Sequence, residues 1–148
     1  MKFSDLIIAA ALLFVVGLVL NGVLFVPLAP LKNYMSLVAG VIAGLIVSII
    51  VGYLFAVQIR EESRLRAIGS IVLLATAGLM IFIVGWFANP LASPAVKDAM
   101  QSMFNTSGWT DYDWFGYMAL VMALDIIVYV VVNFVGLYVG SMLKPKKT

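Results

Sequence analysis

The residues best suited to chemistry in this sequence are three polar side chains inside its last apolar run. Asp125, Tyr129 and Asn133 follow one another at intervals of four. Residues four apart lie on the same face of an α-helix, so these groups would form one polar stripe. A carboxylate, a phenol and an amide could coordinate a cation, pass on a proton, or hydrogen-bond a neighbouring helix. An ionisable residue deep in a membrane helix is by default a functional-site hypothesis.

The expected partner of Asp125 is Asn21. Asp125 comes eight residues after Tyr117, which places it about 12 Å below the outer end of its helix at 1.5 Å per residue. The first apolar run travels in the opposite direction and carries Asn21 to nearly the same depth. The sequence therefore predicts a hydrogen bond between Asn21 and Asp125 that joins the first and fourth runs.

Two interpretations of the stripe stay open. In the first, Asp125 is a structural clamp that holds helices together. In the second, Asp125 is an ion or proton site and forms a polar path with Asn133 and Asn21. A path needs several aligned polar groups, and the apolar runs hold no second deep carboxylate and no basic counter-ion. The clamp is therefore the favoured interpretation.

The residue types exclude several kinds of chemistry. The chain has no Cys and no His, so it cannot supply a thiol nucleophile, a disulfide exchange site, a zinc site of the usual kind or a histidine-ligated haem. No pair of a nucleophile and a base is evident either. We expect no catalytic residue, no metal and no cofactor, and therefore no enzyme.

Composition assigns the chain to the integral membrane proteins. Of 148 residues, 64% are hydrophobic and 11% are charged, against about half and a quarter in a typical soluble domain. The net charge of +2 does not indicate a nucleic-acid partner, because the basic residues stand at the ends of apolar runs. The lipid bilayer is the expected surroundings of nearly the whole chain.

Four apolar runs are long enough to cross the hydrocarbon core, which needs about 20 residues. They cover about 5–28, 34–58, 67–88 and 114–142. The sequence thus predicts an all-α, polytopic, four-transmembrane-helix bundle that forms one domain over 1–148. No small-x-small cleavage site follows the first run, so we expect a retained span rather than a signal peptide.

The basic residues predict the orientation of the bundle. With four spans, one side of the membrane receives seven of the nine basic residues, and the other receives Lys32 and Lys97. The seven are Lys2, Arg60, Arg64, Arg66, Lys144, Lys146 and Lys147. Basic residues favour the cytoplasmic side, so both termini should be cytoplasmic, in a prokaryotic plasma membrane. The mixed-sign segment 59–66 is expected to be a hairpin with local ion pairs.

The outer loop, 89–113, has features of its own. Ser93 and Pro94 are typical of a helix start, and apolar residues at helical spacing follow, which predicts a short amphipathic helix. Asn105 begins the only N-x-[ST] match and is a possible glycosylation site. Asp113 is expected to be the N-cap of the fourth span.

Small residues predict close helix packing. Gly40, Gly44, Ser48 and Gly52 recur every four residues in the second run, and Gly136 and Gly140 do so in the fourth. Small residues let backbones approach closely in a bilayer. The partner helix could belong to this chain, to another subunit or to a second copy.

Two functional hypotheses follow. The first is a non-catalytic membrane subunit that packs against a larger membrane protein complex and stabilises it. The second is a small oligomeric transporter or channel that uses Asp125 with Asn133 and Asn21 as a polar path.

Overall fold

The computed structural model describes residues 1–28, 33–61, 63–92 and 110–145, with single positions at 94, 95, 98, 102 and 108. Inside the helices it does not describe the side chains of residues 20–28, 33–37, 83–84, 86–92, 111, 114–115, 117–118, 121–122 and 125. The predicted contact between Asn21 and Asp125 therefore lies outside the described residues.

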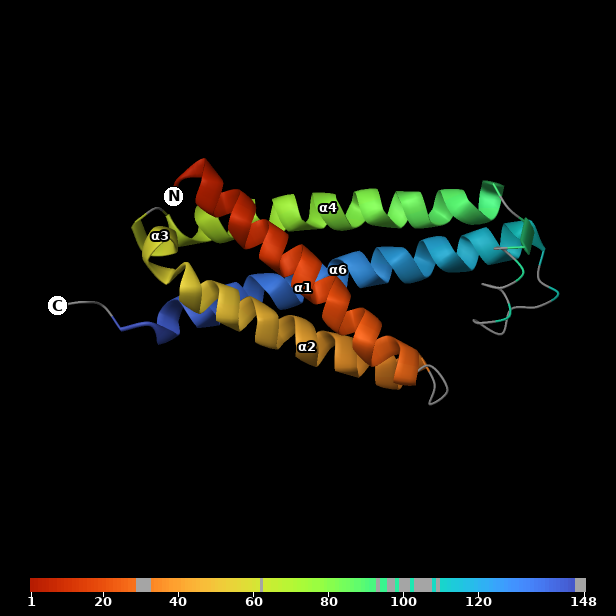
Figure 1. Ribbon diagram of the computed structural model, residues 1–148, viewed down its shortest axis with the longest axis horizontal. Coiled ribbons are helices and arrows are strands. Elements are labelled where there is room, and N and C mark those ends of the chain that lie inside the picture. Colours follow the sequence, from red (N-terminus) through yellow and green to blue (C-terminus); the bar gives the residue numbers. More distant parts are fainter. Residues whose placement is uncertain are drawn as a thin grey trace.

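All regular structure in the described part of the chain is helical. The elements are α1 (Phe3–Leu28), α2 (Asn33–Leu54), α3 (Ala56–Glu61), α4 (Arg64–Ala92) and α6 (Asp111–Leu143). The four long helices run along the long axis of the molecule, and α3 joins α2 to α4 at the end where both termini lie (Figure 1). The long helices pack in the cyclic order α1, α2, α6, α4, and α2 with α6 shares the largest interface.

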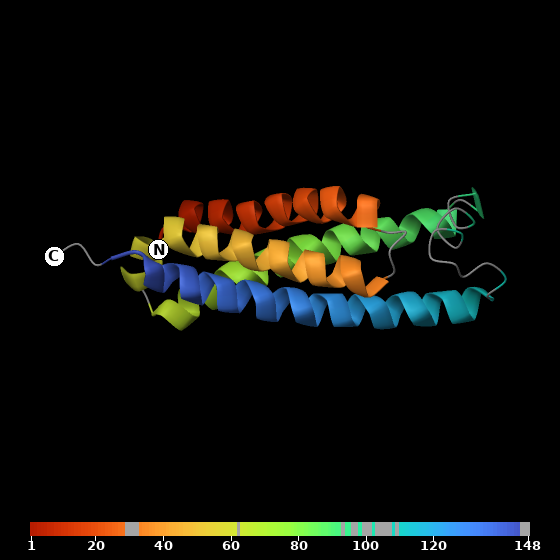
Figure 2. The same ribbon diagram turned by 90° about the horizontal axis from the view of Figure 1, so that it is seen from below.

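Among the residues whose side chains are described, two helical segments are long and apolar enough to cross a membrane. They are Arg64–Phe82 in α4 and Ile126–Leu143 in α6, and two shorter apolar segments are Phe3–Val19 and Val38–Leu54. Figure 2 shows the four long helices from a second side, with α1 and α6 on opposite sides of the bundle and α2 between them. The membrane character predicted from composition is consistent with these segments.

The core is described at the end of the bundle that carries the termini, because most side chains toward the other end lie outside the described residues. It is built from the inward faces of all five helices, around Leu13, Ile59, Ile68, Ile71 and Leu137, each at most 1% exposed. Large apolar side chains on the outward faces are exposed in contrast, among them Leu73 at 73% and Ile81 at 75%. The outer surface is therefore more suited to lipid or protein than to water.

The second predicted span differs from the structure. The sequence predicted one helix over 34–58 and a hairpin over 59–66, but α2 ends at Leu54 and the separate helix α3 follows Phe55. Hydrogen bonds from Phe55 N to Val51 O (3.0 Å) and from Ile59 N to Phe55 O (2.9 Å) bridge the break. The redirected turn buries Ala56 and Ile59 completely, which gives a physical reason for the break.

The start of the fourth helix also differs. Thr110, not Asp113, is the N-cap: the Asp113 backbone N–H donates to Thr110 Oγ1 (3.2 Å). The Thr110 backbone N–H donates in turn to Asp113 Oδ2 (3.3 Å). This reciprocal capping box needs an acid at the third helical position, so the helix begins at Asp111, three residues before the predicted span.

The predicted outer helix is only partly described. Positions 94, 95, 98 and 102 have helical backbone, and the rest of the segment, with Asn105, lies outside the described residues. Gly108 has a φ of +90°, which a glycine adopts easily.

Candidate functional site

The small residues that recur every four positions form a ridge on α2 and another on α6, and these two small-residue ridges lie against one another. An added Cβ at Gly52 would be 2.9 Å from Leu137 Cα, and one at Gly140 would be 2.9 Å from Tyr53 N. One at Gly136 would overlap the side chain of Ser48. These positions are therefore close backbone crossings where no larger residue fits without a shift. We refer to this contact of α2 with α6 as the seam.

The polar member of the seam is Ser48, which is completely buried. Its Oγ lies 2.7 Å from Gly44 O and 3.0 Å from Leu45 O in its own helix. Across the seam it is 3.5 Å from Val132 O. The hydroxyl is therefore satisfied within α2 and makes a weaker contact with α6. Gly40, the first residue of the predicted ridge, is half-buried.

The polar stripe of α6 is directed to its own helix where it is described. Asn133 is 3% exposed, and its Nδ2 donates to Tyr129 O at 2.8 Å. Ser141 is fully buried, and its hydroxyl donates to Tyr138 O at 2.8 Å. Donation to a carbonyl three or four residues earlier satisfies a buried polar group without a second helix. Hydrogen bonds of this kind, within one helix, are typical of polar residues that pack against a neighbouring helix.

Two hydroxyls inside the bundle differ from this pattern. Tyr129 OH and Thr76 Oγ1 are buried and have no hydrogen-bond partner among the described residues. Tyr129 packs against the apolar core. An unsatisfied buried polar group costs about 1–3 kcal/mol, so a further polar partner would be stabilising at either hydroxyl.

Metal binding has no support in the described part of the chain, which contains no cluster of three or more acidic, His or Cys residues placed to hold an ion. Asp125 and Asn21, the centre of the predicted polar path, lie outside the described side chains. The structure thus describes only the Tyr129–Asn133 part of the predicted site.

Arg60 of α3 caps the carboxyl end of α6. Its Nε and Nη2 donate to Ser141 O at 3.0 and 2.5 Å, and Nη2 also reaches Met142 O and Lys144 O. The last carbonyls of a helix have no partner in the helix and carry its negative dipole end. Arg60 satisfies them, whereas the sequence had assigned it to a hairpin with local ion pairs.

Two further cations lie over aromatic rings at this end. Arg64 Cζ is 5.5 Å from the centre of the Tyr138 ring, and Lys144 Nζ is 5.5 Å from that of Tyr53. Such contacts hold a cation by the negative face of the ring. They had no sequence signal, because the partners are 74 and 91 residues apart.

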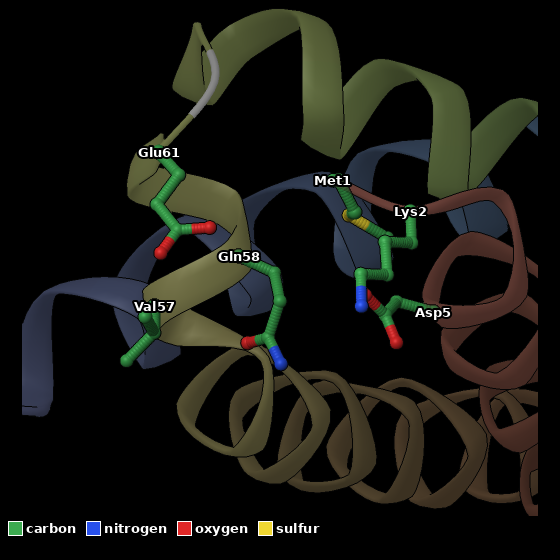
Figure 3. A pocket seen from close by; sticks show the side chains of 6 residues that line it. All are labelled: Met1, Lys2, Asp5, Val57, Gln58 and Glu61. Atoms are coloured by element: carbon green, nitrogen blue, oxygen red, sulfur yellow. The ribbon is translucent and has the colours of Figure 1, made fainter.

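Two open grooves lie at the same end and differ in charge. The first has a volume of about 490 Å³ and lies between the start of α1 and α3, where Lys2, Asp5, Gln58 and Glu61 bring both signs of charge (Figure 3). Gln58 Oε1 is buried there without a partner among the described residues. The second groove, about 380 Å³, is lined by Arg60, Ser63, Arg64, Leu65 and Tyr138. The described side chains of its lining include basic but no acidic ones.

Comparison with protein-family models, with curated proteins and with solved structures gives no match to the chain.

Proposed function

We propose that this chain is a four-span integral membrane protein that acts as a non-catalytic subunit, packing against a larger membrane complex and stabilising it. The proposal has three parts, which are the number of spans, the orientation and the role.

Helix length supports four spans. The helices α1 and α2 have 26 and 22 residues, so at 1.5 Å per residue they are about 39 and 33 Å long. The hydrocarbon core is about 30 Å thick. Both helices are therefore long enough to cross it beside α4 and α6.

The distribution of charge supports cytoplasmic termini. Lys2, Arg60, Arg64 and Lys144 belong to the end of the bundle where α3 and both termini lie (Figure 1). A basic end is favoured on the cytoplasmic side. With four spans, the sequence assigns Lys32 and Lys97 to the opposite side, and we propose that the chain lies in a prokaryotic plasma membrane with both termini inward.

The observation that carries the role is the way the buried polar groups are satisfied. Ser48, Asn133 and Ser141 donate to carbonyls of their own helices, and the seam leaves no room for a substrate between α2 and α6. In contrast, the outward faces expose large apolar side chains along every long helix. These two observations support a role in which the outward surface packs against other membrane proteins.

An alternative role is a small oligomeric transporter or channel. The observation that favours it is the buried, unpartnered hydroxyl of Tyr129, which lies one helical turn from both Asp125 and Asn133. A polar path through Asp125, Asn133 and Asn21 would give this hydroxyl a partner.

Reconstitution separates the two roles. The purified chain is placed in liposomes, and ion and proton flux are measured for the natural sequence and for Asp125→Asn. A subunit gives no flux above empty liposomes for either chain. Flux that Asp125→Asn abolishes would establish the transporter instead.

Labelling tests the number of spans and the orientation. The chain has no Cys, so a single introduced cysteine is the only thiol that can be labelled. Cysteines at Lys2, Ser63 and Lys147 should be labelled only after the membrane is permeabilised, and one at Lys32 should be labelled in intact cells. Labelling of Ser63→Cys in intact cells would contradict the four-span topology.

A further inference from the structure

We infer that the basic groove at the inner end of the bundle is a binding site for the headgroup of an anionic phospholipid. The groove is the one lined by Arg60, Ser63, Arg64, Leu65 and Tyr138. The inference rests on the proposed membrane embedding, since it requires this end to lie at the lipid headgroups.

The charge of the described lining favours an anion. Two guanidinium groups line the groove, and none of the described side chains in its lining is a carboxylate. The neighbouring groove, in contrast, contains Asp5 and Glu61 beside Lys2 (Figure 3). Arginine is well suited to phosphate because its planar group donates two parallel hydrogen bonds. Among the described side chains, those of the groove with Arg60 and Arg64 are therefore the more complementary to an anion.

The two guanidinium groups are preorganised. The Arg60 guanidinium is held by the carbonyls at the end of α6 through Nε and Nη2, and these bonds do not use its Nη1 donors. The Arg64 guanidinium is held over the Tyr138 ring, and its edge remains able to donate. Both groups are therefore fixed before the ligand arrives, which lowers the entropic cost of binding. Ser63 is an exposed residue that also lines the groove, and its hydroxyl is a third group there that can donate.

A further feature of the site distinguishes a lipid from a free phosphate. An apolar stripe on α6 leads away from the groove toward the middle of the bundle. Val131, Val135 and Tyr138 recur at helical spacing on this stripe and are 55%, 47% and 37% exposed. Leu65, at the rim of the groove, is 61% exposed. A ligand with a phosphate and an acyl chain would contact the arginines and the stripe together, whereas inorganic phosphate would contact only the arginines.

Native mass spectrometry of the full chain tests the site. The protein is released from vesicles of phosphatidylcholine with 30% phosphatidylglycerol, and bound lipid is counted as collision energy rises. The natural chain should retain one phosphatidylglycerol, and millimolar inorganic phosphate should not displace it. Arg64→Gln should weaken retention about tenfold or more, because it removes a charged hydrogen-bond donor from the phosphate. Arg64→Lys, which keeps the charge, should lose less.

Arg66→Gln is the matched control, because Arg66 is exposed and does not line the groove. It removes the same charge and should retain the lipid as the natural chain does. Equal losses for Arg64→Gln and Arg66→Gln would overturn the site, as would equal retention of phosphatidylcholine or displacement by inorganic phosphate.

Flotation with vesicles of pure phosphatidylcholine tests the membrane embedding separately from the lipid site. A chain that floats with these vesicles, but retains no phosphatidylglycerol in the mass spectrometry experiment, refutes the lipid site and leaves the membrane embedding intact. A chain that does not float refutes the embedding, and with it the lipid site.

Discussion

Ser48 of α2 occupies the space that a side chain at Gly136 of α6 would need. An added Cβ at Gly136 would overlap Ser48 Oγ and lie 2.7 Å from Ser48 Cβ. The two residues are 88 positions apart in the chain, and their contact fixes how closely the second and fourth long helices approach. The small-residue ridges thus pair with one another inside the chain in this structure.

The seam predicts the effect of adding one methyl group. Gly136→Ala should lower the free energy of unfolding by about 1–3 kcal/mol, because overpacking forces side chains or backbone to shift. Unfolding in a titration with sodium dodecyl sulfate measures it. Gly69→Ala is the control, since no atom lies within 4 Å of a Cβ there, and it should be neutral or stabilising.

A compensating change sharpens this test. Ser48→Gly removes both atoms that a Cβ at Gly136 would overlap, so Gly136→Ala with Ser48→Gly should recover part of the loss. The two changes should therefore be non-additive, as expected for residues in contact. Strict additivity would show that the two side chains do not meet.

The Arg60 cap predicts local loosening of the end of α6. Arg60→Gln should raise hydrogen exchange in residues 138–144 and cost about 1–3 kcal/mol, because a charged donor leaves several carbonyls. Arg66→Gln removes the same charge from an exposed position and should leave exchange in that segment unchanged. Equal exchange in both variants would argue against the cap.

Asn133 offers a test of the polar stripe. Its amide donates within its own helix, so Asn133→Leu, of similar volume, should change the free energy of unfolding by less than about 1 kcal/mol. Asn133→Asp should cost about 3 kcal/mol, because it places a carboxylate inside the membrane. If Asn133→Leu lowers the free energy of unfolding as much as Asn133→Asp does, the amide of Asn133 has a hydrogen-bond partner on another helix. That result would support the transporter interpretation.

Cross-linking tests the predicted contact of Asn21 with Asp125. In the cysteine-free chain, Asn21→Cys with Asp125→Cys should form a disulfide under mild oxidation, since a disulfide requires Cα atoms within about 7 Å. Asn21→Cys with Ile127→Cys is the control, because Ile127 is 59% exposed on another face. Cross-linking of the control pair alone would show that Asp125 faces away from Asn21.

The sequence was a good guide where one rule dominates. The lengths of the apolar runs predicted the four long helices to within a few residues at most ends. The hydropathy of a run depends on its own residues and not on the helices that it contacts. Repeated small residues identified Gly52, Gly136 and Gly140 as close-packing positions, since no other residue lets backbones approach so closely. They did not identify which helices meet.

The sequence was a poor guide where the partner is far away in the chain. The break between α2 and α3 at Phe55 accompanies the burial of Ile59 and the hydrogen bonds of Arg60 to the end of α6. Neither contact can be predicted from the residues next to Phe55 in the sequence. The basic segment 59–66 indicated only orientation, since charge patterning does not show that Arg60 caps a helix 81 residues away. Thr110 was passed over as the N-cap because Asp113 is also a favoured cap residue, and only the geometry shows which of the two precedes the helix.

The most direct test of the proposed role is native co-purification. The chain is tagged at its carboxyl end in its own cells, extracted in mild detergent, and its partners are identified and counted by mass spectrometry. The account predicts a larger membrane protein in fixed ratio to this chain, retained when Asp125 is replaced by Asn. Recovery of the chain alone, or only as copies of itself, would contradict the role as a subunit.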